Sequence, residues 1–136
     1  MIEYIADKWP ENKSKLRDEL ANTPQQKYDY KYLLNMVLVH ILGMKEPVIH
    51  EIDDGNYNGS LIYVFFDEGE YKYPCILDYY TCFADYGSCS GCDALEGIRM
   101  YDDGLPTENQ LDEYMSLCLN LFQSIKPSSY NFLKSL

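Results

Sequence analysis

The chain has 136 residues, the size of one domain, and we expect residues 1–136 to form a single domain that buries its own core. It carries 22 acidic against 11 basic residues, and the net charge of −11 argues against direct nucleic-acid binding and favours basic protein partners. The longest apolar stretch, residues 33–44, is too short to cross a membrane, and the N-terminus lacks a signal-peptide pattern. We therefore expect a soluble, cytoplasmic protein.

Two helices are expected in the first third of the chain. Residues 10–21 carry charges on most turns and are typical of a short amphipathic helix. Thr23 is suited to cap a second helix, with Pro24 at its first position and Gly43 at its end. The apolar residues that recur between them at helical spacing are Tyr30, Leu33, Leu34, Val37, Leu38, Ile41 and Leu42.

The middle of the chain changes to a strand pattern. Residues 48–52, 60–66 and 71–82 are rich in β-branched and aromatic side chains, and turn-forming clusters separate them. Because both connections are short, these runs predict a three-stranded antiparallel meander.

Two further helices are expected beyond the strands. Residues 93–100 are suited to a short helix, and the spacing of Thr107 and Gln110 is that of a capping box. Apolar residues then recur at helical period as far as Ile125, which predicts a long C-terminal helix.

Three cysteines lie close together in the centre of the chain, at positions 82, 89 and 92. Two thiolates in a Cys-x-x-Cys pair can hold one zinc ion when the chain between them curls, and a small residue such as Gly91 permits that curl. Cys82, at the expected end of the third strand, is placed to reach the same ion. We therefore expect a structural zinc site with Cys82, Cys89 and Cys92 as ligands.

The fourth zinc ligand is less directly indicated. The candidates are Asp93, Asp85, Cys75, Cys118, His40 and His50. We favour Asp93 because it adjoins the cysteine pair, although the same residue is suited to cap the helix that follows. Cys118 lies in an apolar helical stripe and is better explained as core packing.

Other chemistries remain open for the cysteine cluster. A redox-active pair needs Cys89 near a helix N-terminus, where the pKa of a thiol falls, but the βαβ context of such proteins is absent. Reduced, unliganded cysteines are the third alternative. The sequence carries no nucleotide-binding glycine loop and no metalloprotease or deaminase signature, so we expect no enzyme. With the zinc knuckle included, the fold expected is α+β: two N-terminal helices, a three-stranded antiparallel β-meander, a zinc-knuckle loop and a long C-terminal helix.

The acidic residues and tyrosines are interleaved between residues 57 and 103. About half of these tyrosines are explained as half-buried sheet residues. Tyrosine also supplies contact area in protein interfaces, and carboxylates beside it pair with Lys and Arg. The carboxylates we expect to bind a partner are Asp67, Glu68, Glu70, Asp102 and Asp103.

The run Tyr86-Gly-Ser-Cys89-Ser-Gly-Cys92-Asp93 resembles a motif in small phage and prophage proteins. The wider profile, a small acidic domain with a suggested metal site, looks like that of phage anti-CRISPR proteins, in particular inhibitors of type II-A systems. The resemblance implies a non-enzymatic inhibitor that binds the RNA-guided nuclease of the host, or another basic host protein, and hinders the loading of target DNA. The alternatives are a thiol-disulfide oxidoreductase that uses Cys89 and Cys92, and a zinc-stabilised phage regulatory protein with another partner.

Overall fold

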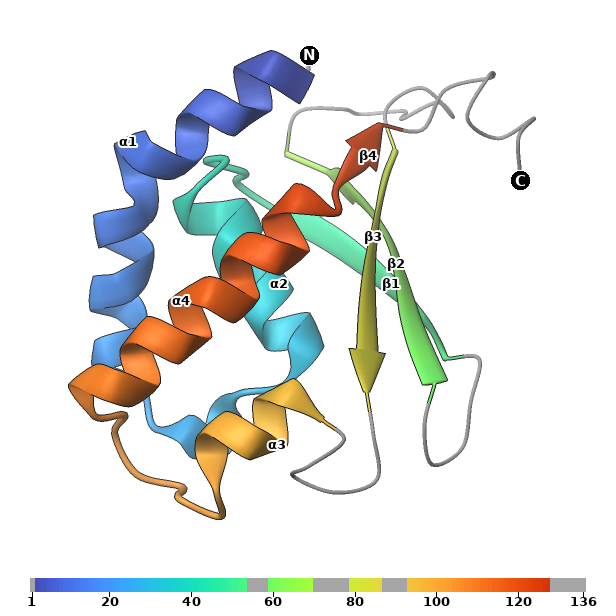
Figure 1. Ribbon diagram of the computed structural model, residues 1–136. Helices are drawn as coiled ribbons and strands as arrows, with labels where there is room; N and C mark the ends of the chain where they lie inside the picture. The colour runs from blue at the N-terminus through green and yellow to red at the C-terminus, as the bar shows by residue number, and fades with distance from the viewer. Residues whose placement is uncertain (1, 54–58, 70–78, 87–92, 128–136) are drawn as a thin grey trace.

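The computed structural model describes residues 2–53, 59–69, 79–86 and 93–127. These residues form a helical layer packed against one antiparallel sheet (Figure 1), so the predicted α+β class is confirmed. The elements in chain order are α1 (Ile2–Ala21), η1 (Gln25–Lys27), α2 (Tyr30–His40), β1 (Pro47–Asp53), β2 (Gly59–Asp67), β3 (Tyr80–Tyr86), α3 (Ala94–Arg99), α4 (Glu108–Gln123) and β4 (Lys126–Pro127).

The sheet has the strand order β1-β2-β3-β4, and every neighbouring pair is antiparallel. The predicted meander is therefore present, but it has one strand more than expected. The added strand, β4, is only two residues long and follows α4 directly, where it pairs with the start of β3 through Thr81 and Lys126.

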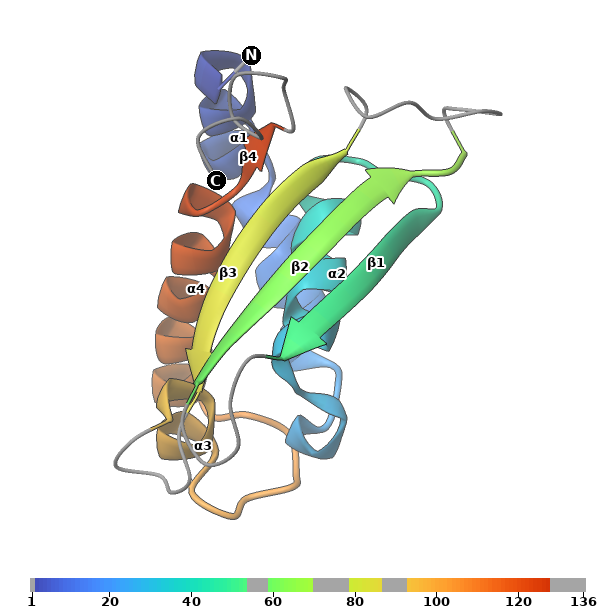
Figure 2. The same cartoon turned by 90° about the vertical axis from the view of Figure 1, so that its right-hand side faces the viewer.

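The helices cover a single face of the sheet, as Figure 2 shows with the strands in front and the helices behind. Side chains alternate across a strand, and Leu61, Tyr63 and Phe65 of β2 point to the helical layer, where they are buried. They meet apolar residues of α1, α2 and α4 at helical spacing, including Leu16, Leu33 and Leu121. This single layer of contacts forms the core.

Both N-terminal helices differ from the expectation at their start. α1 begins at Ile2 and contains Pro10, rather than beginning there. The turn ahead of Pro10 is held on the core because Trp9 packs on Phe122, with ring centroids 5.5 Å apart. α2 begins six residues later than predicted, because the side chain of Asp29 accepts a hydrogen bond from the amide of Tyr32 and caps it.

The third strand also lies later than expected. We predicted it over residues 71–82, but β3 spans Tyr80–Tyr86, and residues 70–78 lie outside the described part of the chain. Cys82 is therefore the third residue of a seven-residue strand and not its last. α3 and α4 agree with the prediction, and Thr107 and Gln110 form the expected capping box.

None of the helices that the structure describes is both long enough and apolar enough to span a bilayer.

Candidate protein-recognition site

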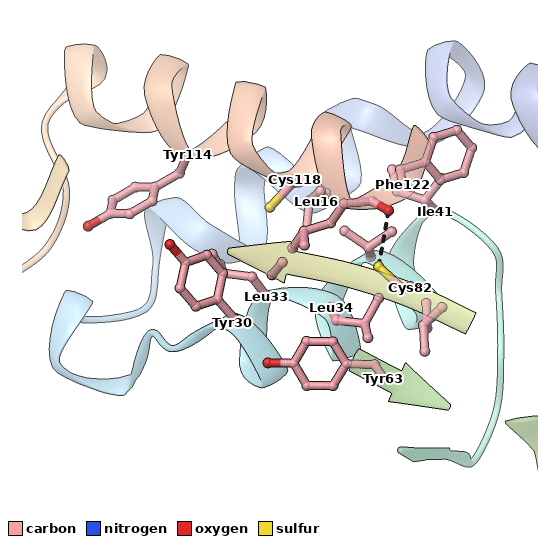
Figure 3. Packing of buried hydrophobic residues seen from close by; sticks show 14 of the residues in the cluster. Leu16, Tyr30, Leu33, Leu34, Ile41, Tyr63, Cys82, Tyr114, Cys118 and Phe122 are labelled. Atoms are coloured by element: carbon pink, nitrogen blue, oxygen red, sulfur yellow. Dashed lines mark hydrogen bonds between the residues drawn. The ribbon is translucent and has the colours of Figure 1, made fainter. Parts of the chain in front are cut away.

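Cys82, one of the predicted zinc ligands, points into the core between β3 and α4 (Figure 3). Its side chain is fully buried, and Sγ lies 3.2 Å from the carbonyl oxygen of Leu121 and 3.0 Å from the hydroxyl of Ser124. Burial raises the pKa of this thiol to about 11, an effect that the Ser124 hydroxyl only partly offsets. Cys82 is thus a buried, hydrogen-bonded thiol in this arrangement.

Asp93, the predicted fourth ligand, caps α3. Its Oδ1 accepts hydrogen bonds from the amides of Leu95 and Glu96, at 2.9 and 3.2 Å, and from the hydroxyl of Tyr30 at 2.7 Å. The side chain is almost fully buried. Of the two roles that the sequence leaves open for Asp93, the capping role is the one its geometry displays.

The predicted zinc site is not assembled by its described members. Cys82 lies against the C-terminal end of α4, whereas Asp93 contacts the start of α2. The described residues contain no group of three or more side chains suited to hold a metal ion. Cys89 and Cys92 lie outside the described residues, so zinc binding by that pair stays a prediction.

The four described members of the five carboxylates predicted to bind a partner do not share one surface. Asp67 is buried at the end of β2, where its two oxygens accept hydrogen bonds from the amides of Lys45, Glu46 and Gly69 at 3.1–3.2 Å. It joins the start of β1 to the turn after β2, so it is not available to a partner. Glu68 beside it is exposed, and Glu70 lies outside the described residues.

Asp102 and Asp103 lie at the other end of the molecule. They belong to the connection between α3 and α4, which occupies the lower end of Figures 1 and 2, whereas β2 ends at the upper end. The single acidic patch expected from the sequence is therefore split, and only Asp102 and Asp103 remain together on an exposed segment.

The segment that contains these two aspartates, residues 100–105, also exposes apolar side chains. We call it the recognition loop. Met100, Tyr101 and Leu105 are 64%, 87% and 58% exposed, and they are three of the five large hydrophobic residues exposed in the described chain. Apolar side chains grouped among charges on a protruding loop are typical of a protein-binding site.

The recognition loop is held in place by its own backbone. The carbonyl oxygen of Gly104 accepts hydrogen bonds from the amide of Gln25 at 2.8 Å and from its Nε2 at 3.2 Å, and that of Asp103 accepts one from the amide of Gln26. The amide of Gly104 donates to Oδ1 of Asp102 at 3.0 Å. The exposed side chains are therefore presented by a fixed backbone, which lowers the entropic cost of binding.

Two residues of the loop adopt a backbone conformation that side chains disfavour. Met100 and Tyr101 have φ angles of 50° and 62°, in the left-handed region. Each such residue costs roughly 1 kcal/mol or more relative to right-handed backbone, and such costs concentrate at functional sites. Here the conformation turns the chain at the end of α3 and leaves Tyr101 almost entirely in solvent.

Gln25 anchors the recognition loop from within the protein. Its side chain is fully buried, accepts a 2.6 Å hydrogen bond from the hydroxyl of Tyr114 and donates to Oε1 of Gln110. The sequence pattern predicts Gln25 only as part of a helix, because its hydrogen-bond partners lie 79 to 89 residues away. The signal available for the loop was the presence of Met100, Tyr101 and Leu105 inside a turn cluster.

The surroundings of the recognition loop are acidic. Residues 93–113 contain seven acidic residues and one arginine. Glu108 and Asp112 of α4 pair with Arg17 of α1 at 2.8 Å each, which leaves Asp102 and Asp103 as the carboxylates on the loop itself. The loop thus combines negative charge with exposed apolar side chains.

Several of the tyrosines whose side chains the structure describes belong to the core. Tyr63, Tyr30 and Tyr114 are buried, and their hydroxyls bond to carboxyl or amide oxygens inside the protein. Among the described tyrosines of the central segment, Tyr101 is the one that is largely exposed.

No family model, curated protein or solved structure matches this chain.

Proposed function

We propose that this protein is a non-enzymatic inhibitor that binds a basic protein surface through the recognition loop. The observation that carries the proposal is the loop itself, in which Tyr101, Met100 and Leu105 stand exposed beside Asp102 and Asp103 on a pinned backbone. Such a loop supplies an aromatic anchor for an apolar pocket and carboxylates for Arg or Lys around it.

The partner that we propose, the RNA-guided nuclease of type II-A systems, is taken from the resemblance to anti-CRISPR proteins. The RNA-guided nuclease of type II-A systems holds nucleic acid in a positively charged channel. A carboxylate-bearing loop that binds at the entrance of that channel displaces the phosphates of target DNA and so hinders DNA loading. The same chemistry fits another basic host protein, and binding to the nuclease separates the two.

The proposed zinc site has a supporting role in this function. We propose that Cys89 and Cys92 supply two of the four ligands of a zinc ion ahead of α3, and that Cys82 and Asp93 do not supply the others. Bound zinc would act there as a structural cross-link in the chain that leads into α3 and the recognition loop.

The test compares two double variants with the same change in net charge. The first pair, Asp102→Lys with Asp103→Lys, reverses the charge of the recognition loop. The control pair, Glu46→Lys with Glu68→Lys, reverses two exposed acids at the opposite end of the molecule. These two residues are neighbours, because the amide of Glu68 donates a hydrogen bond to the carbonyl of Glu46. Binding to the purified nuclease–guide complex and loading of labelled target DNA are measured for both.

We expect the loop reversal to slow association at least tenfold at low salt, with a smaller difference at high salt. Tyr101→Ala should weaken binding at least tenfold through faster dissociation, because it removes the anchor. The control pair should stay within about twofold of the unmodified protein. The proposal fails if the nuclease does not bind, or if the control pair and the loop pair have equal effects.

A further inference from the structure

Strand β1 forms one edge of the sheet. In the order β1-β2-β3-β4 it pairs only with β2, and no other described strand lies beside it. Its seven residues extend over about 20 Å, and residues 50–53 are exposed. An exposed edge of this length can pair with a further strand by backbone hydrogen bonds.

The helix-facing side of this edge is hollowed. A hollow of about 430 Å³ lies between α2 and β1, lined by Lys27, Lys31, Tyr32, Asn35, Pro47 and Ile49. Asp29 also borders it, and its carboxylate caps α2. A strand added beside β1 can place inward-pointing side chains at this hollow, and acidic side chains would meet the two lysines there.

Charges of opposite sign lie at the two ends of β1. Lys45 precedes the strand and is exposed, and Lys31 borders the hollow beside its first half. Glu51 and Asp53 lie in the second half, on the helix-facing side that Ile49 also occupies. An antiparallel copy of the same strand therefore brings acids to bases at both ends.

We propose that β1 pairs with β1 of a second copy of this chain, antiparallel about a two-fold axis at His50. In the register in which all seven residues pair, Val48 lies opposite Ile52 of the second copy, and Ile49 lies opposite Glu51 of the second copy. Directly opposite residues point to the same side of a sheet, as they do between β1 and β2. The two sheets become one.

Each contact away from the axis occurs twice in this arrangement, once on each side of it. Ile52, which is 52% exposed, gains an apolar neighbour in Val48 of the second copy. Asp53 of the second copy enters on the side of the hollow, near Lys45, Lys27 and Lys31. Glu51 of the second copy lies on the same side, where it accepts a hydrogen bond from Tyr63 of its own chain. The net charge of −11 on each copy opposes association at long range, so pairing strengthens as salt screens that repulsion.

The test is sedimentation equilibrium over a range of protein concentrations, without any partner protein. We expect a concentration-dependent mass that reaches twice the 15.9 kDa of one chain. Ile52→Asp should raise the dissociation constant at least tenfold, because it places a carboxylate opposite Val48. Its matched control is Phe83→Asp, which changes a residue 40% exposed on the same face of the sheet but two strands away from β1, in β3.

A charge swap tests the register. Lys45→Glu and Asp53→Lys should each weaken the dimer, and the double variant should recover at least half of the lost affinity. Thermal melts of each variant show that the fold is kept. The proposal is overturned if the protein is a monomer at all concentrations. It is also overturned if Phe83→Asp disrupts the dimer and Ile52→Asp does not, because that result indicates that the sheets pack face to face. These measurements do not involve the nuclease, so they test the dimer independently of the proposed function.

Discussion

The state of Cys82 is determined by its neighbours rather than by its spacing in the chain. Its thiol lies in an apolar layer and is hydrogen-bonded to Leu121, an environment that disfavours the thiolate a zinc ion needs. Recruitment of Cys82 to a metal would also withdraw a buried side chain from the interface between β3 and α4. The energetic cost of that change would offset part of the stabilisation that a third cysteine ligand supplies.

Zinc content can therefore separate the cysteines. We expect protein purified without chelator to hold about one zinc ion per chain, to keep it in Cys82→Ala and to lose it in Cys89→Ser. Cys82→Ala should still lower the free energy of unfolding by about 1–2 kcal/mol, through lost packing and a lost hydrogen bond. Mass spectrometry under native conditions gives the metal content. Loss of zinc in Cys82→Ala would show that the core rearranges to bind metal, and metal-free unmodified protein would end the zinc proposal.

Among the elements, α3 depends most on a single side chain. It has six residues, too few to be stable alone, and Asp93 satisfies two of its first amides. Asp93 also bonds to Tyr30 at the start of α2, so one carboxylate fixes α3 both to its own first turn and to the helical layer. The recognition loop begins where this helix ends.

A double-mutant cycle measures this connection. Asp93→Ala should lower the free energy of unfolding by about 2–3 kcal/mol, since it removes a cap and leaves the Tyr30 hydroxyl buried without its acceptor. Tyr30→Phe should cost about 1–2 kcal/mol. The double variant should cost less than the sum of the two single variants, as determined by urea unfolding. Strict additivity would mean that the two side chains do not interact.

The helices and strands differ in how closely their bounds could be predicted from the sequence. Helical period and the capping box placed α4 closely, because local chemistry defines both of its ends. The start of β3 was misplaced because aromatic and apolar residues recur on both sides of Pro74, from Tyr71 to Cys82. β4 has two residues, too few for any pattern, and it exists because α4 directs the chain back beside β3. The conformation of the recognition loop depends on hydrogen bonds to Gln25, and no pattern of neighbouring residues predicts a contact between segments so far apart in the chain.

At the scale of the whole molecule, burial of thiol and phenol groups makes stability sensitive to alkaline pH. Burial raises the pKa of Cys118 to about 12, and also raises that of Tyr114 to about 12, although nearby Arg99 opposes the shift. Tyr28, Tyr30 and Tyr63 shift in the same direction, chiefly through burial. The unfolded chain releases these protons first, near the ordinary values of 9.0 and 10.0, so it is favoured as pH rises.

We therefore expect the free energy of unfolding to be largely retained below about pH 9 and to fall above it, by up to roughly 1.4 kcal/mol per pH unit for each such group. Urea unfolding in the presence of reductant, repeated from pH 7 to pH 11, measures the slope. Between pH 9 and pH 11, Cys118→Ala should make the fall in the free energy of unfolding with pH less steep, by up to the contribution of one titrating group. An unchanged slope in that variant would show that the Cys118 thiol does not titrate differently on unfolding.

The hydrogen bonds from Gln25 and Gln26 to the recognition loop have a practical consequence. The loop owes its shape to a segment about 80 residues earlier in the chain, and Gln25 is itself held by Tyr114 of α4. A synthetic peptide of residues 100–105 lacks all of these supports and samples many conformations in water. Mimicry of this surface therefore requires either the folded protein or a cyclic scaffold that reproduces two consecutive left-handed residues.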